Sequence, residues 1–288
     1  MALNPLQERY AEVNGVRLHY MTAGSGQTLL FLHGFPEFWY AWRAQLEAFS
    51  ADYHVVAPDL RGYNLSDRPA DVAAYTIPTL VADVSALLAQ VSPGRQAILI
   101  AHDWGGIVAW AFALTHPSVL QKLVIINAPH PAIFARELAT NPAQQQAAGY
   151  MTMLRGPDAE ALLGADDFAR LDGMLFGGAV SPNAFSAADR AAYHAAWSLP
   201  GGLTGALNYY RAVALTPPPS SPPNLTVTVP TLVLWGEQDS ALLTGNLNGL
   251  DTYVPNLRVQ RFPQAGHWVV HEQPDAVTEA IRAFITTP

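Results

Sequence analysis

The sequence predicts an α/β fold: a mostly parallel sheet flanked by helices, with a helical cap inserted between two parts of the core. Over residues 1–128, short apolar, β-rich runs alternate with helical patterns, which is typical of successive βαβ units. Residues 129–225 change to Ala-rich helical stretches broken by Gly and Pro, and strand patterns return over 226–288. We therefore expect a core formed by the first and last ranges, and a cap domain between them.

The expected elements follow the chain in order. Two runs, 10–21 and 28–32, lie on either side of a glycine-rich turn signal at 23–26 and are the opening strands. A helix over 38–50, a buried strand over 54–57, an amphipathic helix over 77–91 and a buried strand over 97–101 come next. Residues 107–115 are apolar almost all round, as in a helix packed on a sheet, and 123–127 is again a strand. Strands over 230–235 and 257–262 and a helix over 275–285 close the core.

The cap ends in a run of prolines and serines over residues 216–223. Proline can neither continue a helix nor donate a hydrogen bond inside a sheet, so this run predicts a stiff connector back to the core.

Composition excludes several classes of protein. The 288 residues are 50% hydrophobic and contain no cysteine, which rules out disulfides, thiolate catalysis and iron–sulfur clusters. Lys122 is the single lysine, and the 14 arginines are scattered along a chain of net charge -8, so we expect no nucleic-acid partner. The N-terminal residues lack a signal-peptide pattern, and no apolar run is long enough to span a membrane. We therefore expect a cytoplasmic protein with no membrane partner.

The strongest chemical signal follows the strand over 97–101. That strand runs through Asp103 directly into a helix, with small residues at Ala101 and Gly105. Strand, sharp turn and helix form the context of a nucleophile elbow, in which the middle residue is lifted above the sheet edge. An aspartate there, in place of serine, argues against an esterase, lipase or peptidase and favours attack on sp3 carbon, as in an epoxide or a carbon–halogen bond. The alternative is that Asp103 only caps the helix.

A second strand end supplies the expected oxyanion hole. The strand over 28–32 runs into His33, Gly34 and Phe35, and this glycine turn can aim the Phe35 N–H into the same crevice. Together with the N–H of Trp104, it would stabilise the oxyanion formed when an ester on the nucleophile is hydrolysed. We interpret His33 as a buried structural histidine because it precedes the turn.

His267 and Asp239 complete the expected catalytic set. His267 follows the strand over 257–262 in a glycine-containing loop, and Asp239 lies just past the strand over 230–235. The order nucleophile, acid, histidine along the chain is the one expected at the carboxyl edge of such a sheet. His267 would activate water, and Asp239 would orient its ring. His271 has the spacing of a second metal ligand, but no third ligand is evident, so we expect neither metal nor cofactor.

These motifs resemble those of the epoxide hydrolases of the α/β-hydrolase fold, and the resemblance extends over essentially the whole chain. In that family two cap tyrosines hydrogen-bond the epoxide oxygen and protonate it as the ring opens. The resemblance implies Tyr150, in the stretch 149–157, and Tyr210, in the stretch 208–211, with Tyr209 as a less suitable substitute for the second. The alternative is that both are core tyrosines. The motifs that carry the resemblance are 33–37, 102–106, 236–239 and 266–268.

Haloalkane and haloacetate dehalogenases share this catalytic set and remain the alternative activity. Phe35 stands where many haloalkane dehalogenases carry an asparagine, and Trp104 and Ile107 stand where haloacetate dehalogenases place arginines. A non-catalytic ligand-binding protein on this fold is a further alternative. We expect a small apolar epoxide and water as substrates, a pocket lined by Phe35, Trp104, Phe134 and Trp268, and a monomer or homodimer.

Overall fold

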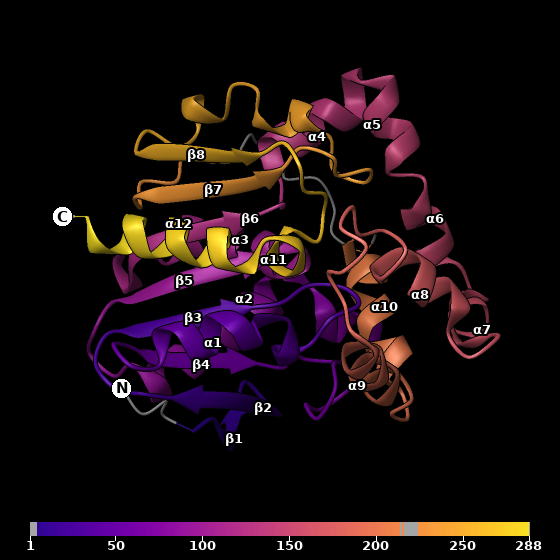
Figure 1. Ribbon diagram of the computed structural model, residues 1–288, viewed down its shortest axis with the longest axis horizontal. Coiled ribbons are helices and arrows are strands. Elements are labelled where there is room, and N and C mark those ends of the chain that lie inside the picture. Colours follow the sequence, from indigo (N-terminus) through magenta and orange to yellow (C-terminus); the bar gives the residue numbers. More distant parts are fainter. Residues whose placement is uncertain (1–4, 214, 216–223, 288) are drawn as a thin grey trace.

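The computed structural model describes residues 5–213, 215 and 224–287, and its centre is an eight-stranded sheet (Figure 1). The strand order is β1-β2-β4-β3-β5-β6-β7-β8. The pairs β1–β2 and β2–β4 are antiparallel, and all later pairs are parallel, which confirms the predicted fold class. The strands are β1 (Gln7–Val13), β2 (Val16–Ala23), β3 (Thr28–Leu32), β4 (His54–Pro58), β5 (Ala97–His102), β6 (Leu120–Ile126), β7 (Thr231–Gly236) and β8 (Leu257–Phe262).

Helices cover both faces of the sheet. In β3, Leu30 and Leu32 join the core cluster that contains α2 (Ile77–Val91) and α3 (Asp103–Thr115). The alternate residues Leu29 and Phe31 join the cluster of α1 (Arg43–Phe49) and α12 (Pro274–Thr286). Successive side chains of a strand point to opposite faces, so a strand buried on both faces is apolar without interruption.

The opening of the chain differs from the prediction. Residues 10–21 are not one strand, because Asn14 and Gly15 adopt positive φ angles of 44° and 78° and turn the chain back between β1 and β2. Asn-Gly is the preferred sequence for such a two-residue hairpin turn, and this signal was missed. The helix expected over 38–50 is a 3-10 turn, η1 (Trp39–Trp42), followed by α1. The helix expected from residue 107 begins earlier, at Asp103.

The described residues between β6 and β7 form seven helices, which gather beyond the carboxyl ends of the strands (Figure 1). This confirms the helical insertion. Its limits at residues 129 and 225 stay a prediction, and the proline run at 216–223 lies outside the described residues. Within the described ranges, no helix is long and apolar enough to span a membrane. The helices are α4 (Pro131–Thr140), α5 (Pro142–Ala147), α6 (Tyr150–Arg155), α7 (Ala159–Gly164), α8 (Ala169–Leu175), α9 (Ala187–Trp197) and α10 (Gly202–Val213).

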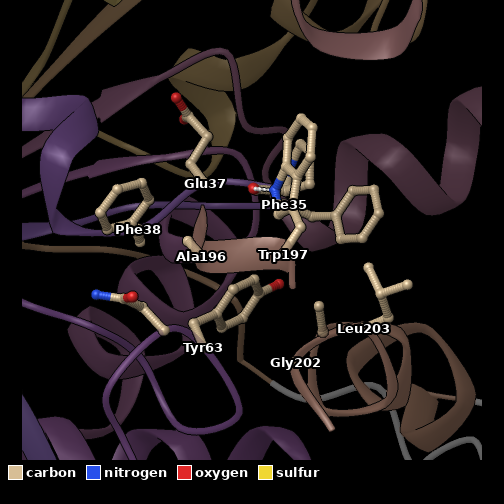
Figure 2. Close-up of a pocket in the computed structure, with 11 residues that line it drawn as sticks. Phe35, Glu37, Phe38, Tyr63, Ala196, Trp197, Gly202 and Leu203 are labelled. Carbon is tan, nitrogen blue, oxygen red and sulfur yellow. Dashed lines mark hydrogen bonds between the residues drawn. The ribbon is translucent and has the colours of Figure 1, made fainter. Parts of the chain in front are cut away.

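The inserted helices are bonded directly to loops of the core. Figure 2 shows Trp197 of α9 against the loop after β3, where its indole N–H donates to the Pro36 carbonyl at 2.7 Å. On α10, a Cβ at Gly205 would lie only 2.4 Å from the Gly62 carbonyl oxygen. The two backbones therefore touch, and glycine is required at this contact. The adjacent Tyr209 hydroxyl donates to the Arg61 carbonyl at 2.8 Å.

Candidate active site

Asp103 occupies a strained turn between β5 and α3, as the nucleophile-elbow prediction requires. Its φ is +49°, a left-handed value that a non-glycine residue adopts only where its surroundings enforce it. Close packing leaves no room for side chains beside it. A Cβ at Gly34 would lie 2.2 Å from Asp103 Oδ1, and a Cβ at Gly105 would lie 2.4 Å from the Leu32 carbonyl oxygen. The two glycines therefore allow the loop after β3 and the start of α3 to close around the carboxylate.

The structure brings the three predicted catalytic residues together at the carboxyl edge of the sheet. His267 Nδ1 lies 2.7 Å from Asp239 Oδ2, and His267 Nε2 lies 3.6 Å from Asp103 Oδ2. The ring thus bridges the two carboxylates. A water molecule bound by Nε2 would face the Asp103 carboxyl group, as a general base requires.

Asp239 is held by more groups than the sequence suggested. Its Oδ1 accepts hydrogen bonds from the Ala241 and Leu242 N–H groups at 2.8 and 2.9 Å. Asn127, at the end of β6, donates to Oδ2 at 2.8 Å and accepts a bond from the Gly236 N–H at 2.8 Å. The sequence analysis did not identify Asn127 as a partner of Asp239. An amide side chain at the end of the strand next to the Asp239 loop could have indicated it. These bonds fix the Asp239 carboxylate beside the His267 ring.

The charges of the three residues reinforce one another. Burial alone would lower the pKa of His267, but the charge of Asp239 and the contacts with Asp103 raise it well above its ordinary value. Burial would likewise raise the pKa of Asp239, but the His267 ring and the donors described above lower it. Both shifts favour a protonated His267 ring beside an ionised Asp239 carboxylate.

Of the two predicted oxyanion donors, the N–H groups of Phe35 and Trp104, the first has a hydrogen bond to Asp103 in the structure. The Phe35 N–H donates to Asp103 Oδ1 at 2.7 Å, so it already binds the oxygen that would carry charge during ester hydrolysis. Trp104 is the second residue of α3, and the amides of a helix's first turn have no partner within the helix. Its part in the oxyanion hole stays a prediction.

Tyr150 and Tyr210 lie close to each other and line two cavities together with Asp103. Tyr150 begins α6, Tyr210 lies on α10, and their ring centroids are 6.3 Å apart. Burial raises the pKa of both phenols, and the nearby Asp103 carboxylate raises it further, so both remain protonated donors. The Tyr209 hydroxyl donates to the Arg61 carbonyl, so Tyr210 rather than Tyr209 is the better candidate for the second proton donor.

Two cavities meet at Asp103, Tyr150 and Tyr210. One, of about 300 Å³, is lined by Trp104 and Phe134 among other mostly apolar residues. The other, of about 310 Å³, is lined by residues that include Phe35, His267 and Trp268. The four residues expected in the substrate pocket line these two cavities, two in each.

His33 and His271 are occupied by structural contacts. The buried His33 Nε2 accepts a bond from the Leu60 N–H at 3.0 Å and Nδ1 bonds the Gly34 carbonyl at 2.9 Å. Burial lowers the pKa of His33, and both ring nitrogens contact the backbone, as expected for a structural histidine. His271 is directed at the Glu37 carboxylate, 2.6 Å away. Among the described residues, no group of three or more His, Asp and Glu side chains is arranged to hold a metal ion.

The mostly parallel sheet and the Asp103, His267 and Asp239 site are those of an α/β-hydrolase, and comparison with known proteins gives the same class. The family described as alpha/beta hydrolase fold matches residues 27–274. AB hydrolase superfamily protein YfhM of Bacillus subtilis is 38% identical to this chain, covering 96% of it and 97% of the relative. Epoxide hydrolase 4 of Mus musculus is 37% identical, covering 94% of this chain and 77% of the relative.

A solved structure gives the same result. The epoxide hydrolase of Bacillus megaterium, in complex with an inhibitor, is 36% identical and superposes with a TM-score of 0.89, covering 97% of this chain and 100% of that chain. A variant of that enzyme was solved with its naphthyloxy-propane-diol product. The chain belongs to the epoxide hydrolases of the α/β-hydrolase fold, as the sequence resemblance implied.

Proposed function

We propose that this epoxide hydrolase converts a neutral, mainly apolar epoxide to a vicinal diol through a covalent ester on Asp103. The observation that carries the proposal is the placement of the Asp103 carboxylate. One oxygen is bound by the Phe35 N–H and the other lies 3.6 Å from His267 Nε2. The same carboxylate lines both cavities together with Tyr150 and Tyr210.

In the first step, Asp103 Oδ2 attacks a ring carbon of the epoxide. The carbon–oxygen bond of the ring breaks, and the departing oxygen takes a proton from Tyr150 or Tyr210. The products are an alkyl ester on Asp103 and a tyrosinate. Because alkylation removes the negative charge of Asp103, it removes one of the influences that raise the pKa of His267. His267 then loses its proton, and the tyrosinate is protonated again, so the total charge of the site is unchanged.

In the second step, neutral His267 takes a proton from water, and the resulting hydroxide attacks the carboxyl carbon of Asp103. The negative charge develops on Oδ1, which the Phe35 N–H already binds. Collapse of the intermediate expels the diol oxygen, which takes the remaining proton of the water. Asp103 is again a carboxylate and His267 again an imidazolium, so the cycle closes without any other reactant.

The cavity walls support the substrate class. The larger share of the first cavity is aliphatic or aromatic, and its lining includes Ile107, Phe134 and Leu138. Such a wall favours an uncharged, apolar substituent, and the second cavity beyond Asp103 leaves room for a group on the other side of the epoxide. The position beside Gly34 that could distinguish a haloalkane dehalogenase carries Phe35, whose contribution is a backbone N–H.

A single turnover in water labelled with heavy oxygen tests the proposal. With enzyme in excess over epoxide, the diol should contain no label, because its new oxygen comes from Asp103. The peptide that contains Asp103 should gain the label from water. Label in the diol and none in the peptide would show direct attack of water on the epoxide and would refute the covalent mechanism. Chloroalkanes and haloacetates, assayed alongside for halide release, should react far more slowly than the best epoxide.

A further inference from the structure

Two arginines form hydrogen bonds between the helices that carry the proposed proton donors, α6 and α10, which pack against each other. Arg155, the last residue of α6, donates from Nε to the backbone carbonyl of Tyr210 at 3.1 Å. In the opposite direction, Arg211 of α10 donates from Nη2 to the carbonyl of Gly156, directly after α6, at 3.1 Å. Each helix is therefore held by an arginine of the other, and the carbonyl that Arg155 binds belongs to a proposed proton donor.

The position of Tyr210 in its helix explains why its carbonyl accepts this bond. The helix α10 ends at Val213, so Tyr210 lies in the last turn. The carbonyl groups of a last turn have no N–H partner within the helix. An arginine side chain is a favourable partner there, because its positive charge also complements the helix dipole. Arg155 therefore supplies a donor from another helix, and the bond couples the end of α10 to α6.

The two arginines differ in their other contacts. Arg211 forms a two-pronged ion pair with Glu160 of α7, in which both nitrogen–oxygen distances are 2.7 Å. Within the part of the chain that the structure describes, Arg155 forms no ion pair. It instead lines the first cavity together with Tyr150 and Tyr210. Arg211 therefore joins α10 to α7, whereas Arg155 lies beside the proposed proton donors.

Aromatic contacts alone do not fix the Tyr210 hydroxyl. The Tyr210 ring lies edge to face against Phe35 and Trp104, at centroid distances of 5.3 and 5.0 Å. Such pairs are favourable over a range of centroid distances from about 4.5 to about 7 Å. A hydrogen bond is more restrictive in both distance and angle. The bond from Arg155 therefore fixes the backbone from which the phenol extends more closely than ring packing does.

We propose that Arg155 is a positioning residue for Tyr210, and that its hydrogen bond between the two helices places the Tyr210 hydroxyl for proton donation to the epoxide oxygen. The inference rests on the proposed function, in which Tyr150 and Tyr210 are the donors. A contact with the Tyr210 side chain lowers the pKa of Tyr150. The placement of α10 against α6 therefore affects both phenols.

The alternative is that Arg155 acts through its charge. Burial raises the pKa of Tyr150, and the Arg155 guanidinium offsets a small part of that effect. A charge would act on Tyr150 through space, whereas the hydrogen bond acts on Tyr210 through the backbone. The two roles therefore predict different results when the charge is removed and a donor is kept.

Two substitutions separate the hydrogen bond from the charge. Arg155→Met keeps an unbranched side chain and removes both. Arg155→Gln removes the charge but leaves an N–H at the chain position of Nε, which can donate to the Tyr210 carbonyl. We expect Arg155→Met to slow alkylation by about tenfold to a hundredfold, since misplacement of a catalytic group by about 1 Å has such an effect. A neutral hydrogen bond is about half as strong as a charge-assisted one, so Arg155→Gln should lose less than about threefold.

The two half-reactions are measured by rapid mixing with epoxide, quenching and intact-mass spectrometry of the ester. Ester hydrolysis should stay within about threefold of wild type in both variants, because His267 and Asp239 are untouched. The ester should therefore form slowly in Arg155→Met and decay at the normal rate.

A double-mutant cycle identifies the tyrosine through which Arg155 acts. In a Tyr210→Phe background the hydroxyl is absent, so adding Arg155→Met should slow alkylation by less than about threefold. In a Tyr150→Phe background Tyr210 is the remaining donor, so the same substitution should slow alkylation by about tenfold or more. An arginine that served only the fold would have the same effect in both backgrounds.

Arg170→Met is the matched control, because Arg170 is an exposed arginine on α8 of the same insertion. Its alkylation rate should stay within about threefold of wild type. Equal loss in Arg155→Gln and Arg155→Met would assign the effect to charge and overturn the proposal. Equal loss in the two tyrosine backgrounds, equal loss of both half-reactions, an unchanged alkylation rate in Arg155→Met, or failure of that variant to fold would each overturn it as well. Failure of the proposed function is distinguishable, because the wild-type enzyme would then form no ester at all.

Discussion

Replacing Asp103 with asparagine should lower the pKa of His267, because it removes one of the two negative charges that face the ring. Asp103 Oδ2 lies 3.6 Å from His267 Nε2. Two unit charges at that separation attract by about 1 kcal/mol in a medium as polar as water and by about 5 kcal/mol at an effective dielectric constant near 20. Since about 1.4 kcal/mol is tenfold in a proton-binding constant, we expect His267 in the variant to bind its proton roughly tenfold or more weakly.

The direction of this effect matters for the mechanism. An asparagine is neutral and nearly isosteric with the carboxylate, so Asp103→Asn imitates the charge of the alkyl ester. If the imidazolium loses its proton at lower pH in the variant than in the wild type, alkylation itself converts His267 from an acid to a base. The enzyme would then produce its base only when an ester is present to be hydrolysed.

The assay is an NMR titration of ¹⁵N-labelled histidine, with the His267 signals assigned from their loss in His267→Gln. Intact mass should first confirm that the asparagine has not been hydrolysed to aspartate. The matched control is Asp52→Asn, because Asp52 is an exposed acid paired with Arg282, and this variant should titrate as the wild type does. If His267 titrates at the same pH in wild type and Asp103→Asn, Asp103 does not control the ring and the proposed order of steps is wrong.

Three further outcomes are expected. His267→Gln should alkylate and then stall, and intact-mass spectrometry should find the protein heavier by one substrate; steady turnover without an adduct would mean that another residue is the base. Tyr150→Phe and Tyr210→Phe should each slow alkylation by about 10- to 1,000-fold, as for other single donors to a developing oxyanion, and the double variant more. If the double variant is alkylated at the wild-type rate, Tyr150 and Tyr210 serve only in packing. Gly34→Ala should displace the nucleophile, whose Oδ1 would lie 2.2 Å from the new Cβ, and lose about 1–3 kcal/mol of stability by denaturant titration together with activity. Gly164→Ala, whose Cβ would meet only the Leu203 side chain at an ordinary 3.7 Å, should retain both.

The candidate catalytic residues could be selected from the sequence because their signals are local. A buried strand followed by a small-residue turn marks Asp103, and loops just past strand ends mark Asp239 and His267. The choice between Tyr209 and Tyr210 is of another kind. Neighbouring residues on a helix point about 100° apart, so only one of the two can face the cavity, and the resemblance to a family rather than any pattern indicated which.

The supporting contacts were not predictable for a physical reason. The Arg155–Tyr210 and Arg211–Gly156 contacts each join residues 55 positions apart, and no periodicity links such residues. Asn127 was visible only as the end of a strand, and its bond to Asp239 depends on how β6 and β7 align. The missed hairpin at Asn14 and Gly15 differs, because its two-residue signal was present in the sequence.

The bonds between the inserted helices and the catalytic loops restrict how molecules enter and leave. Trp197 holds the Pro36 carbonyl, and Trp268 donates to the Met174 carbonyl of α8 at 3.1 Å. Raising the helices would break both contacts and displace the loops that carry Phe35 and His267. We therefore expect substrate and product to pass through the openings of the cavities instead. Val213 lines the first cavity and is 40% exposed, which places it at such an opening. We expect the width of this opening, more than the cavity volume around Asp103, to set the largest substrate that can enter. A smaller side chain at Val213 should widen the opening.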